Sequence, residues 1–227
     1  ADLDPTPLIE RADVQAFIAE MHKEHGMEPM VLNSLFSKVQ QKPNIIDIFD
    51  RPPTSRPWYQ YRPNFVTQHR IQNGVKFWKD NAGLLKMARQ RYGVPEEIIV
   101  TILGVETNYG KTTGTFRVID ALTTVAFNYP RRSEFFKDEL KEFLLLAQEE
   151  GQNPLKMTGS FAGAMGWPQF MPSSFRKFAI DFDSDGRRDI WNNPADAIGS
   201  VAFYFSEFGY KAGQPTVIRA TVTGDKY

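Results

Sequence analysis

Glycine residues end the apolar-patterned segments of this 227-residue chain at positions that suit helices. They stand just past five such segments, as Gly26, Gly93, Gly110, Gly151 and Gly209. Glycine is the residue that most readily takes the left-handed conformation in which helices end. Pro95 and Pro194 stand at the opposite ends of two segments, where the missing N–H of proline has no helical partner to lose. These positions of glycine and proline predict a chain that is mainly helical.

The apolar periodicity between these stops places the expected helices. They cover residues 8–23, 28–39, 64–92, 95–109, 118–127, 134–150 and 194–208. Gly74 is a candidate interruption of the third helix, and Ser133 is the expected N-cap of the helix over 134–150. Residues 51–63 hold four prolines and three aromatic rings, which predicts an extended crossing with exposed rings. Only TVIRATV, residues 216–222, alternates like a strand, so we expect one small β element near the C-terminus.

The composition is that of an ordinary globular protein, with 41% hydrophobic and 24% charged residues. Basic and acidic residues both total 27, and the resulting zero net charge argues against a nucleic-acid binder. The absence of cysteine excludes disulfides, thiolate metal sites and cysteine nucleophiles. No segment approaches the roughly 20 apolar residues of a membrane span. The N-terminus has neither the basic start nor the apolar stretch of a targeting peptide, so we expect any such segment to have been removed.

A glutamate stands at the end of the most apolar helix, where IIVTILGV runs into ETNYG. Ile102 lies four residues before Glu106 and Ile99 seven, so the three side chains share one helical face. An apolar face partly desolvates a carboxyl group, which raises its pKa and suits it to act as a general acid. The alternative interpretation is a structural glutamate that pairs with an arginine and joins two helices. The spacing alone leaves both interpretations open.

A glycine-rich motif, GSFAGAMGWPQFMPSSF at residues 159–175, leaves its backbone nearly bare at three glycines. Bare backbone permits the close approach of a polymer, and it equally permits tight packing between helices. When the glycines are considered alone, packing between helices is the better explanation. Ser160 and Gln169 are harder to explain by packing. They are polar groups among aromatic and apolar side chains, where hydrogen-bonding groups need partners.

An acidic loop, DFDSDGRRDIWN at residues 181–192, follows most of the EF-hand calcium pattern. Side-chain oxygens stand at loop positions 1, 3, 5 and 9, as Asp181, Asp183, Asp185 and Asp189. Arg187 would contribute its backbone carbonyl at position 7, whereas Asn192 replaces the bidentate glutamate expected at position 12. Aspartates this close together repel one another unless a cation lies among them. The loop therefore predicts a site for a hard cation, with Ca²⁺ favoured.

Three motifs, in order, resemble those of the bacterial lytic transglycosylases, in particular the membrane-bound lytic transglycosylase B family and its soluble forms. They are GVETNYG at 104–110, FNYPRRSEFF at 127–136 and the glycine-rich motif at 159–175. The resemblance implies a mainly α (α+β) fold. Its lysozyme-like core would cover residues 91–215 and include an EF-hand-like loop over 181–196. An additional helical region, 1–90, would partly wrap that core, and residues 216–227 would begin the small β element.

The resemblance also implies an activity, the cleavage of the β-1,4 bond between N-acetylmuramic acid and N-acetylglucosamine without added water. The product carries a 1,6-anhydro ring. Glu106 matches the single catalytic acid of this family, which then acts as the base. No second carboxylate accompanies Glu106 in its motif, whereas standard glycosidases use two, although Asp120 is not excluded by the sequence. Two alternatives stay open: a hydrolytic muramidase, and a non-catalytic glycan-binding scaffold in which Glu106 is structural.

The resemblance places further residues along a substrate groove: Tyr61, Tyr109, Arg131, Arg132, Ser160, Gln169, Phe170 and Tyr204. Ser160 is expected near the catalytic glutamate and Gln169 near the cleavage point. The two arginines suit the carboxylates of peptide stems, because a guanidinium can bond both oxygens. Without the resemblance they would be taken as solvated, and a buried core position is the alternative for Tyr61 and Tyr204.

The resemblance completes the metal site and the biological setting. Asp196 matches a later aspartate that closes the family's metal loop. The expected cofactor is a structural Ca²⁺, with no organic cofactor. The expected partners are the glycan strands of peptidoglycan and other cell-wall enzymes, with no nucleic acid, and the expected state is a monomer. The expected location is the periplasm of a Gram-negative bacterium, as a soluble form or as a lipoprotein whose anchor has been removed.

Overall fold

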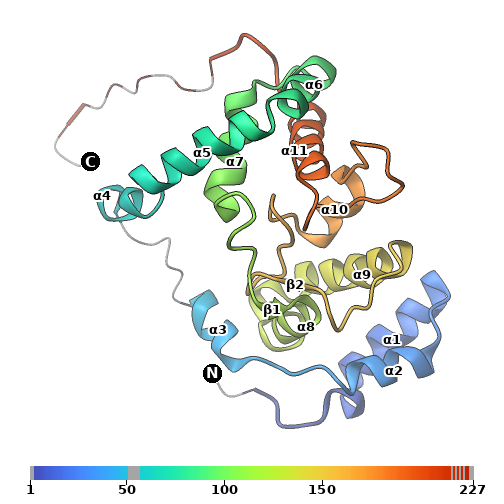
Figure 1. Cartoon of the computed structure of the whole chain (residues 1–227). Coiled ribbons are helices and arrows are strands. Elements are labelled where there is room, and N and C mark those ends of the chain that lie inside the picture. Colours follow the sequence, from blue (N-terminus) through green and yellow to red (C-terminus); the bar gives the residue numbers. More distant parts are fainter. Residues whose placement is uncertain are drawn as a thin grey trace.

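The computed structural model describes residues 3–50 and 57–215, together with 217, 219, 221, 223 and 224. Its first elements are η1 (Leu8–Glu10), α1 (Ala12–His25), α2 (Pro29–Phe36), α3 (Pro43–Asp50), α4 (Trp58–Tyr61), η3 (Arg62–Asn64), α5 (Gln68–Asp80) and α6 (Ala82–Tyr92). There follow α7 (Glu96–Thr107), β1 (Phe116–Arg117), α8 (Val118–Asn128), η4 (Pro130–Arg132), α9 (Ser133–Glu149), β2 (Thr158–Gly159), α10 (Pro172–Phe178) and α11 (Pro194–Glu207). The mainly α prediction is confirmed (Figure 1).

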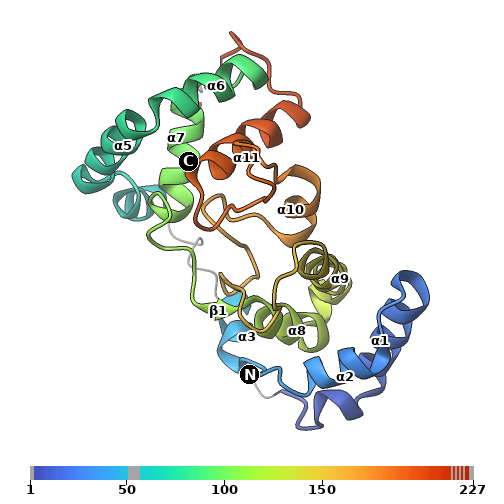
Figure 2. The ribbon, with the colours of Figure 1, turned by 45° about the vertical axis from the view of Figure 1, so that its right-hand side comes forward.

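Two hydrophobic clusters divide the helices into two groups, which lie in different parts of the molecule (Figures 1 and 2). The first cluster joins α1, α2 and α3 to α8, α9 and α10, with Phe143 fully buried inside it. The second joins α5, α6, α7 and α11 around Leu103. The predicted segments 1–90 and 91–215 do not follow this division, because the N-terminal helices contribute to both clusters. As domains, those segments stay a prediction.

The described strands form a single short ribbon beside α8 (Figure 1). β1 and β2 are antiparallel, with Phe116 opposite Gly159 and Arg117 opposite Thr158. Strands of two residues each are too short to show alternation, so the sequence did not predict them. The predicted strand over 216–222 has alternate residues outside the described ones, and it stays a prediction.

Several predicted helix ends are confirmed. Gly26 and Gly93 take left-handed conformations, with φ of 66° and 73°, at the ends of α1 and α6. Asn193 caps α11 by accepting a hydrogen bond from the Ala195 N–H. Ser133 as an N-cap is wrong: it is the first residue of α9, and its hydroxyl donates to the Ala126 carbonyl at 2.6 Å. That carbonyl lies near the end of α8, where the intrahelical partner is lost.

The proline-rich crossing differs from its prediction. Residues 51–56 lie outside the described part, and Trp58–Tyr61 form the single turn α4, so the extended conformation is wrong there. No proline falls inside that turn, which removes the obstacle to a helix. The predicted ring exposure is confirmed for Trp58 and Tyr59, which are 67% and 72% exposed. Two further helices, α3 and α10, are short enough that their apolar periodicity gave no prediction.

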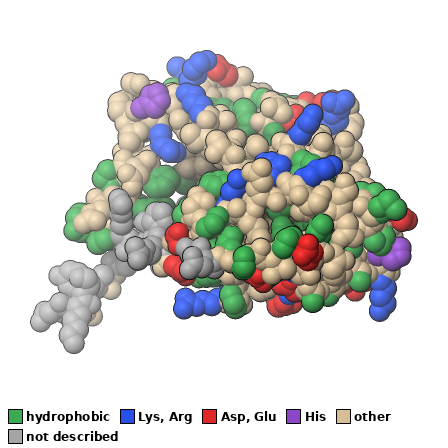
Figure 3. Space-filling view, turned by 90° about the horizontal axis from the view of Figure 1, so that it is seen from below, with side chains coloured by type: hydrophobic (Ala, Val, Ile, Leu, Met, Phe, Trp, Pro, Cys, Tyr) green, Lys and Arg blue, Asp and Glu red, His purple; other side chains and the backbone are tan. Residues whose placement is uncertain are grey.

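The surface matches the balanced charge. Lys and Arg side chains are intermingled with Asp and Glu over the face seen in Figure 3, without a large patch of one sign. Within the described residues, no helix combines the length and the apolar run that a membrane crossing requires.

Gly74 does not interrupt the long helical pattern, which breaks instead at Asn81 between α5 and α6. Gly74 lies buried inside α5, where a Cβ atom would come within 2.5 Å of the Tyr109 hydroxyl. Gly104, on α7, faces the same hydroxyl, again too closely for a Cβ. The two glycines therefore form a notch that admits this tyrosine between α5 and α7.

Substitution of Gly74 by Ala should lower stability although alanine is the better helix former. The methyl group would meet the Tyr109 hydroxyl, and overpacking of this kind costs about 1–3 kcal/mol. For a protein of this size, the melting temperature should fall by roughly 3–10 °C. Gly83→Ala is the matched control, because a Cβ there meets no atom within 4 Å. Equal melting temperatures for the two variants would contradict the notch.

Candidate active site

Glu106 lies in the last turn of α7, just before the chain leaves the helix towards β1 (Figure 1). Ile99 and Leu103 of the same helix are fully buried, Ile102 is half-buried and Glu106 is exposed. The prediction that Glu106 shares the apolar face of Ile99 therefore needs correction, because Ile99 is buried and Glu106 is exposed. Glu106 continues the half-buried edge that runs through Ile98 and Ile102, rather than the face that enters the core.

No hydrogen bond or ion pair joins the Glu106 carboxylate to any described residue, so the alternative of a structural pair with arginine finds no support within the described part of the chain. Burial raises the pKa of Glu106 above its ordinary value of 4.5, in the predicted direction, and no neighbouring charge contributes. Because the residue is open to solvent on one side, we expect a smaller rise than in a fully enclosed carboxyl group. Glu106 is thus a lone, partly desolvated acid.

The end of α7 is fixed from one side by α5. Asn108, and not the predicted Gly110, ends the helix in a left-handed conformation, with φ of 50°. Arg70 donates to the Gly104 carbonyl at 2.6 Å, and Asn73 donates to the side-chain oxygen of Asn108 at 3.1 Å. The sequence did not point to Arg70 or Asn73, because contacts between helices this far apart in the chain leave no local pattern. Arg70 adds a second donor to a carbonyl that already accepts from the Asn108 N–H, and Asn73 fixes the side chain of the residue at which the helix ends.

Tyr109 serves this same contact. Its ring stacks on Phe77 of α5, with ring centroids 4.9 Å apart, and its hydroxyl occupies the notch between Gly74 and Gly104. Burial raises the pKa of the Tyr109 hydroxyl, which therefore stays protonated. The visible role of Tyr109 is in packing, and its predicted contact with substrate stays a prediction.

From the other side, the end of α7 is fixed by the glycine-rich motif. Thr107 is fully buried, and its hydroxyl donates to the Trp167 carbonyl at 2.9 Å while accepting from the Gly110 N–H at 3.0 Å. Gly110 lies directly against the Trp167 indole and leaves no room for a Cβ. The residue next to Glu106 therefore joins two of the motifs that the sequence singled out.

Gln169 strengthens the same junction. Its side-chain NH₂ donates to the Thr113 carbonyl at 3.1 Å and to the Gly166 carbonyl at 2.9 Å. Since both partners are acceptors, they fix the orientation of the amide. Within the described part of the chain, the Gln169 carbonyl oxygen has no donor. Gln169 can therefore offer a ligand only a hydrogen-bond acceptor.

Ser160 closes the turn that begins the glycine-rich motif. Its hydroxyl oxygen accepts from the Ala162 and Ala164 N–H groups at 3.2 and 3.1 Å, which leaves its own hydrogen free to donate. The glycines of the motif are explained by packing, as expected when they are considered alone. A Cβ at Gly159 would meet the Ala164 carbonyl, and one at Gly163 would meet Leu122.

The remaining predicted groove residues come from several elements and are differently exposed. Phe170 is buried, and Tyr204 of α11 is half-buried among rings, with Phe208 only 4.5 Å from it between centroids. Tyr61 is half-buried against Phe65, 4.8 Å between centroids. Packing thus accounts for much of each ring, and their contacts with substrate stay predictions.

Arg131 and Arg132 are exposed in η4, as expected without the resemblance. The Arg132 guanidinium lies over the Phe135 ring, 4.5 Å from its centroid, and neither arginine forms an ion pair with a described residue. Both are therefore available to an anionic ligand. Asp120, by contrast, is buried on α8 and is paired with Arg117 at 2.7 Å. Its other oxygen accepts from the Gln40 N–H, which commits Asp120 to the packing of α8.

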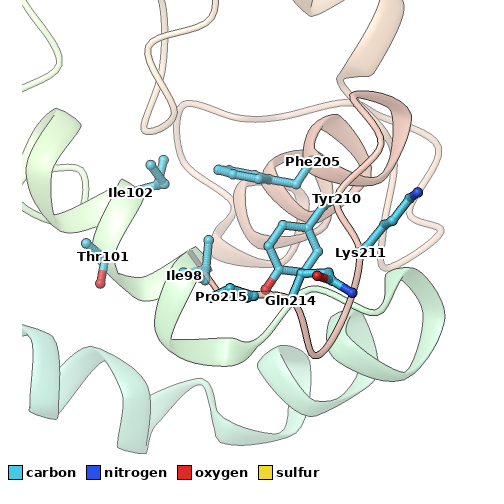
Figure 4. Close-up of a pocket in the computed structure, with 8 residues that line it drawn as sticks. All are labelled: Ile98, Thr101, Ile102, Phe205, Tyr210, Lys211, Gln214 and Pro215. Carbon is cyan, nitrogen blue, oxygen red and sulfur yellow. The ribbon is translucent and has the colours of Figure 1, made fainter. Parts of the chain in front are cut away.

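An apolar pocket of about 440 Å³ continues along the Glu106 edge of α7, towards its N-terminus. Ile98, Thr101 and Ile102 line one side, and Phe205 and Tyr210 line the other (Figure 4). The two rings are nearly perpendicular, at 80°. The nearest lining residue to Glu106 on this edge is Ile102, one helical turn before it, and Glu106 itself does not line the pocket.

The acidic loop forms a compact group of carboxylates. Oxygens of Asp181, Asp183, Asp185 and Asp196 all lie within 4.8 Å of one another. Asp196 is fully buried, and burial raises its pKa, with a further rise from the charges of Asp183 and Asp181. Four hard oxygen donors that repel one another fit a cation such as Ca²⁺. The predicted closure of the loop by Asp196 agrees with this geometry.

The prediction of Asp189 as a ligand is not supported by the geometry. Its carboxylate accepts from the Trp191 and Asn192 N–H groups at 3.0 and 2.9 Å, and it lies outside the carboxylate cluster. Asp189 instead donates its own N–H to Asp196 at 2.8 Å. Local turn bonds thus compete for the side chain that EF-hand spacing assigns to position 9. The carbonyl of Arg187 as a ligand stays a prediction.

Trp167 connects the acidic loop to the neighbour of Glu106. Its backbone N–H donates to the Ile190 carbonyl at 2.9 Å, and its indole N–H donates to the Trp191 carbonyl at 2.7 Å. Its own carbonyl accepts from Thr107. A path of direct hydrogen bonds and adjacent residues thus runs from Asp196 through Trp167 to the end of α7.

The family is defined by comparison with known proteins. Residues 10–227 match the profile of the Transglycosylase SLT domain family. The chain is 44% identical to the membrane-bound lytic murein transglycosylase B of Escherichia coli K12 over 218 residues, covering 92% of this chain and 60% of that one. It thus spans less than two thirds of the length of that curated relative. The chain belongs to the Transglycosylase SLT domain family.

Two solved structures are similar to this one. The soluble lytic transglycosylase SltB1 of Pseudomonas aeruginosa has a TM-score of 0.86 and 51% identity, covering 89% of this chain and 69% of that one. The Escherichia coli lytic transglycosylase Slt35, solved in complex with calcium, has a TM-score of 0.85 and 44% identity, covering 95% and 67%. The predicted lysozyme-like helical fold agrees with both.

Glu106→Gln should raise stability at neutral pH. Because burial raises the folded-state pKa, the ionised carboxylate is less favourable in the folded than in the unfolded chain. Its unfavourable effect therefore appears as pH rises through the folded-state pKa and disappears below the ordinary value of 4.5. The variant should melt above the wild type at pH 7 and equally at pH 3.5.

Glu97→Gln is the matched control on the same helix. Glu97 lies in the first turn of α7, where a negative charge is favourable. Its neutralisation should leave the melting temperature at pH 7 unchanged or slightly lower. Parallel shifts in the two variants would argue against a desolvated carboxyl group at Glu106.

Proposed function

We propose that this protein is a lytic transglycosylase that cleaves the β-1,4 bond between N-acetylmuramic acid and N-acetylglucosamine in peptidoglycan. The observation that carries the proposal is the lone Glu106, partly desolvated and without a partner among the described residues. The similarity of the chain to lytic transglycosylases of two bacteria supports the same activity. Membership of the family supports the substrate class.

In the proposed reaction, Glu106 acts twice. Its protonated carboxyl group, favoured by the raised pKa, donates a proton to the glycosidic oxygen as the bond to the anomeric carbon breaks. The resulting carboxylate accepts the proton of the muramyl C6 hydroxyl, whose oxygen bonds to the anomeric carbon. The proton count balances, no water enters, and the product is the 1,6-anhydro sugar.

Among the described residues, no carboxylate charge acts on the pKa of Glu106, which favours this reaction over a two-carboxylate glycosidase mechanism. Asp120, which the sequence had left open, is committed to Arg117 and is buried. Positive charge at the anomeric carbon must then be stabilised by the substrate, and its 2-acetamido oxygen is suitably placed for that role. A hydrolytic muramidase would use the same acid but would leave a free reducing end.

The groove residues have proposed roles that follow from their free groups. Gln169 accepts a hydrogen bond from a sugar hydroxyl, since only its carbonyl oxygen is unused. Ser160 donates its hydroxyl hydrogen, and Arg131 and Arg132 bind carboxylates of the peptide stem. Tyr61, Tyr109, Phe170 and Tyr204 would supply ring faces for sugars.

The acidic loop is proposed to bind a structural Ca²⁺ through Asp181, Asp183, Asp185 and Asp196. The similar Slt35 structure was solved with calcium, and the oxygen donors here suit that ion. A bound cation would neutralise the mutual repulsion of these carboxylates. The proposed setting is the periplasm of a Gram-negative cell, in keeping with the relatives of this chain.

Glu106→Gln should abolish the release of muropeptides from purified sacculi while glycan binding survives, because Gln cannot donate and accept the proton. Mass spectrometry should find 1,6-anhydro ends in the wild-type products. The alkaline limb of kcat/KM against pH should lie above pH 4.5, since the raised pKa keeps the acid protonated. Free reducing ends would support the muramidase instead, and undiminished release by the variant would falsify the catalytic role of Glu106.

Removal of Ca²⁺ should lower the melting temperature and leave some activity at low temperature. A ligand at 100 times its Kd stabilises the folded state by about 2.7 kcal/mol. EDTA should remove that increment and added CaCl₂ should restore it. Asp183→Asn should weaken the response, whereas Asp138→Asn, on the exposed face of α9, should leave it unchanged. Identical melting curves with EDTA and with CaCl₂ would rule out a structural ion.

A further inference from the structure

A second pocket, of about 720 Å³, lies outside the site described above. It is enclosed by the C-terminal end of α9, the approach to β2 and the acidic loop, with a contribution from the segment that follows Glu106. Polar side chains dominate its lining, among them Thr113, Gln152, Lys156, Thr158, Arg187 and Asn192. Its size is in the range of pockets that bind small ligands.

The negative charges on the wall of this pocket are already neutralised or hydrogen-bonded. Glu149 is paired with Arg176 at 2.6 Å, and Glu150 is paired with Arg188. The Asp189 carboxylate accepts backbone N–H groups within its own turn. None of these carboxylates is left to attract a cationic ligand.

Two positive charges on the same wall are unmatched. Lys156 and Arg187 are exposed, and neither side chain forms a hydrogen bond or an ion pair with any described residue. Arg188 is also basic, but it already forms an ion pair with Glu150. The pocket therefore presents two cationic side chains that have no partner among the described residues, together with neutral hydrogen-bonding groups.

The pocket shares short segments with the candidate active site. The carbonyl of Thr113 accepts from Gln169, and Thr158 lies two residues before Ser160. The wall of the pocket is therefore continuous with the segments that hold Gln169 and Ser160.

We propose that this pocket binds the peptide stem of peptidoglycan, with Lys156 and Arg187 bonding its carboxylates. This inference rests on the function proposed above and adds a second stem-binding site to Arg131 and Arg132. Neutral N-acetylglucosamine needs no cation, whereas a stem carries carboxylates that form charge-assisted hydrogen bonds. The amide groups of a stem match the threonine, glutamine and asparagine side chains of the wall.

The test compares glycan strands that carry stems with the same strands after an amidase has removed them, in saturating CaCl₂. The double variant Lys156→Met and Arg187→Met should raise KM for stem-bearing strands roughly tenfold, with kcat unchanged, because it removes charge-assisted hydrogen bonds. KM for stripped strands should not change. The control, Lys86→Met with Arg89→Met, removes two exposed charges from α6 and should match the wild type on both substrates.

A direct binding measurement separates affinity from turnover. In a Glu106→Gln background, the double variant should bind a soluble disaccharide–tetrapeptide roughly tenfold more weakly than its parent by calorimetry. Lys156→Met alone, outside the acidic loop, should show a smaller loss in the same direction. This single variant also tests the pocket if changes in the loop impair folding.

Two results would overturn the stem site: an unchanged KM for stem-bearing strands, or an equal loss on both substrates. Failure of the wild type to release anhydro products from either substrate would instead overturn the proposed function. If the wild type releases anhydro products from both substrates and the double variant has the same KM, only the proposal that this pocket binds the stem would be rejected.

Discussion

The buried hydroxyl of Thr107 is the contact on which the candidate site depends. It bonds the Trp167 carbonyl and the Gly110 N–H at once, one residue from Glu106. A buried polar group that loses its partners costs about 1–3 kcal/mol, so this junction is strongly favoured once α7 is packed. Because Thr107 is rigidly held, the backbone of Glu106 is held with it. The acid itself can then stay free of any partner that would lower its pKa.

Fixing the backbone while leaving the side chain unpaired resolves a conflict that any general acid faces. An ion pair would hold a carboxylate firmly but would favour its ionised form. Here the fixing is done by neighbours instead: Arg70 bonds a carbonyl of the same helical turn, and Trp167 bonds Thr107. Trp167 also joins the acidic loop, so the group of carboxylates and the acid share one framework.

The sequence predicted features that depend on local pattern. The mainly helical fold, the glycine helix ends and the raised pKa of Glu106 all follow from residues within a few positions of one another. The notch for Tyr109 and the bonds from Arg70 and Asn73 depend on how α5 and α7 meet, and no local pattern records that. The role of Asp189 as a ligand stays a prediction for a related reason. Spacing places a carboxylate in a loop, but backbone N–H groups beside it decide where it points.

The notch of Gly74 and Gly104 also limits how α5 and α7 can move. The Tyr109 hydroxyl fills a recess made by one residue from each helix. A helix advances by about 1.5 Å per residue, so a small slide of either helix along its axis would bring a neighbouring backbone or side chain against the phenol. The Tyr109 hydroxyl thereby fixes the register of α5 relative to α7. This contact therefore favours movement of α5 and α7 together as one body over a slide of one helix along the other.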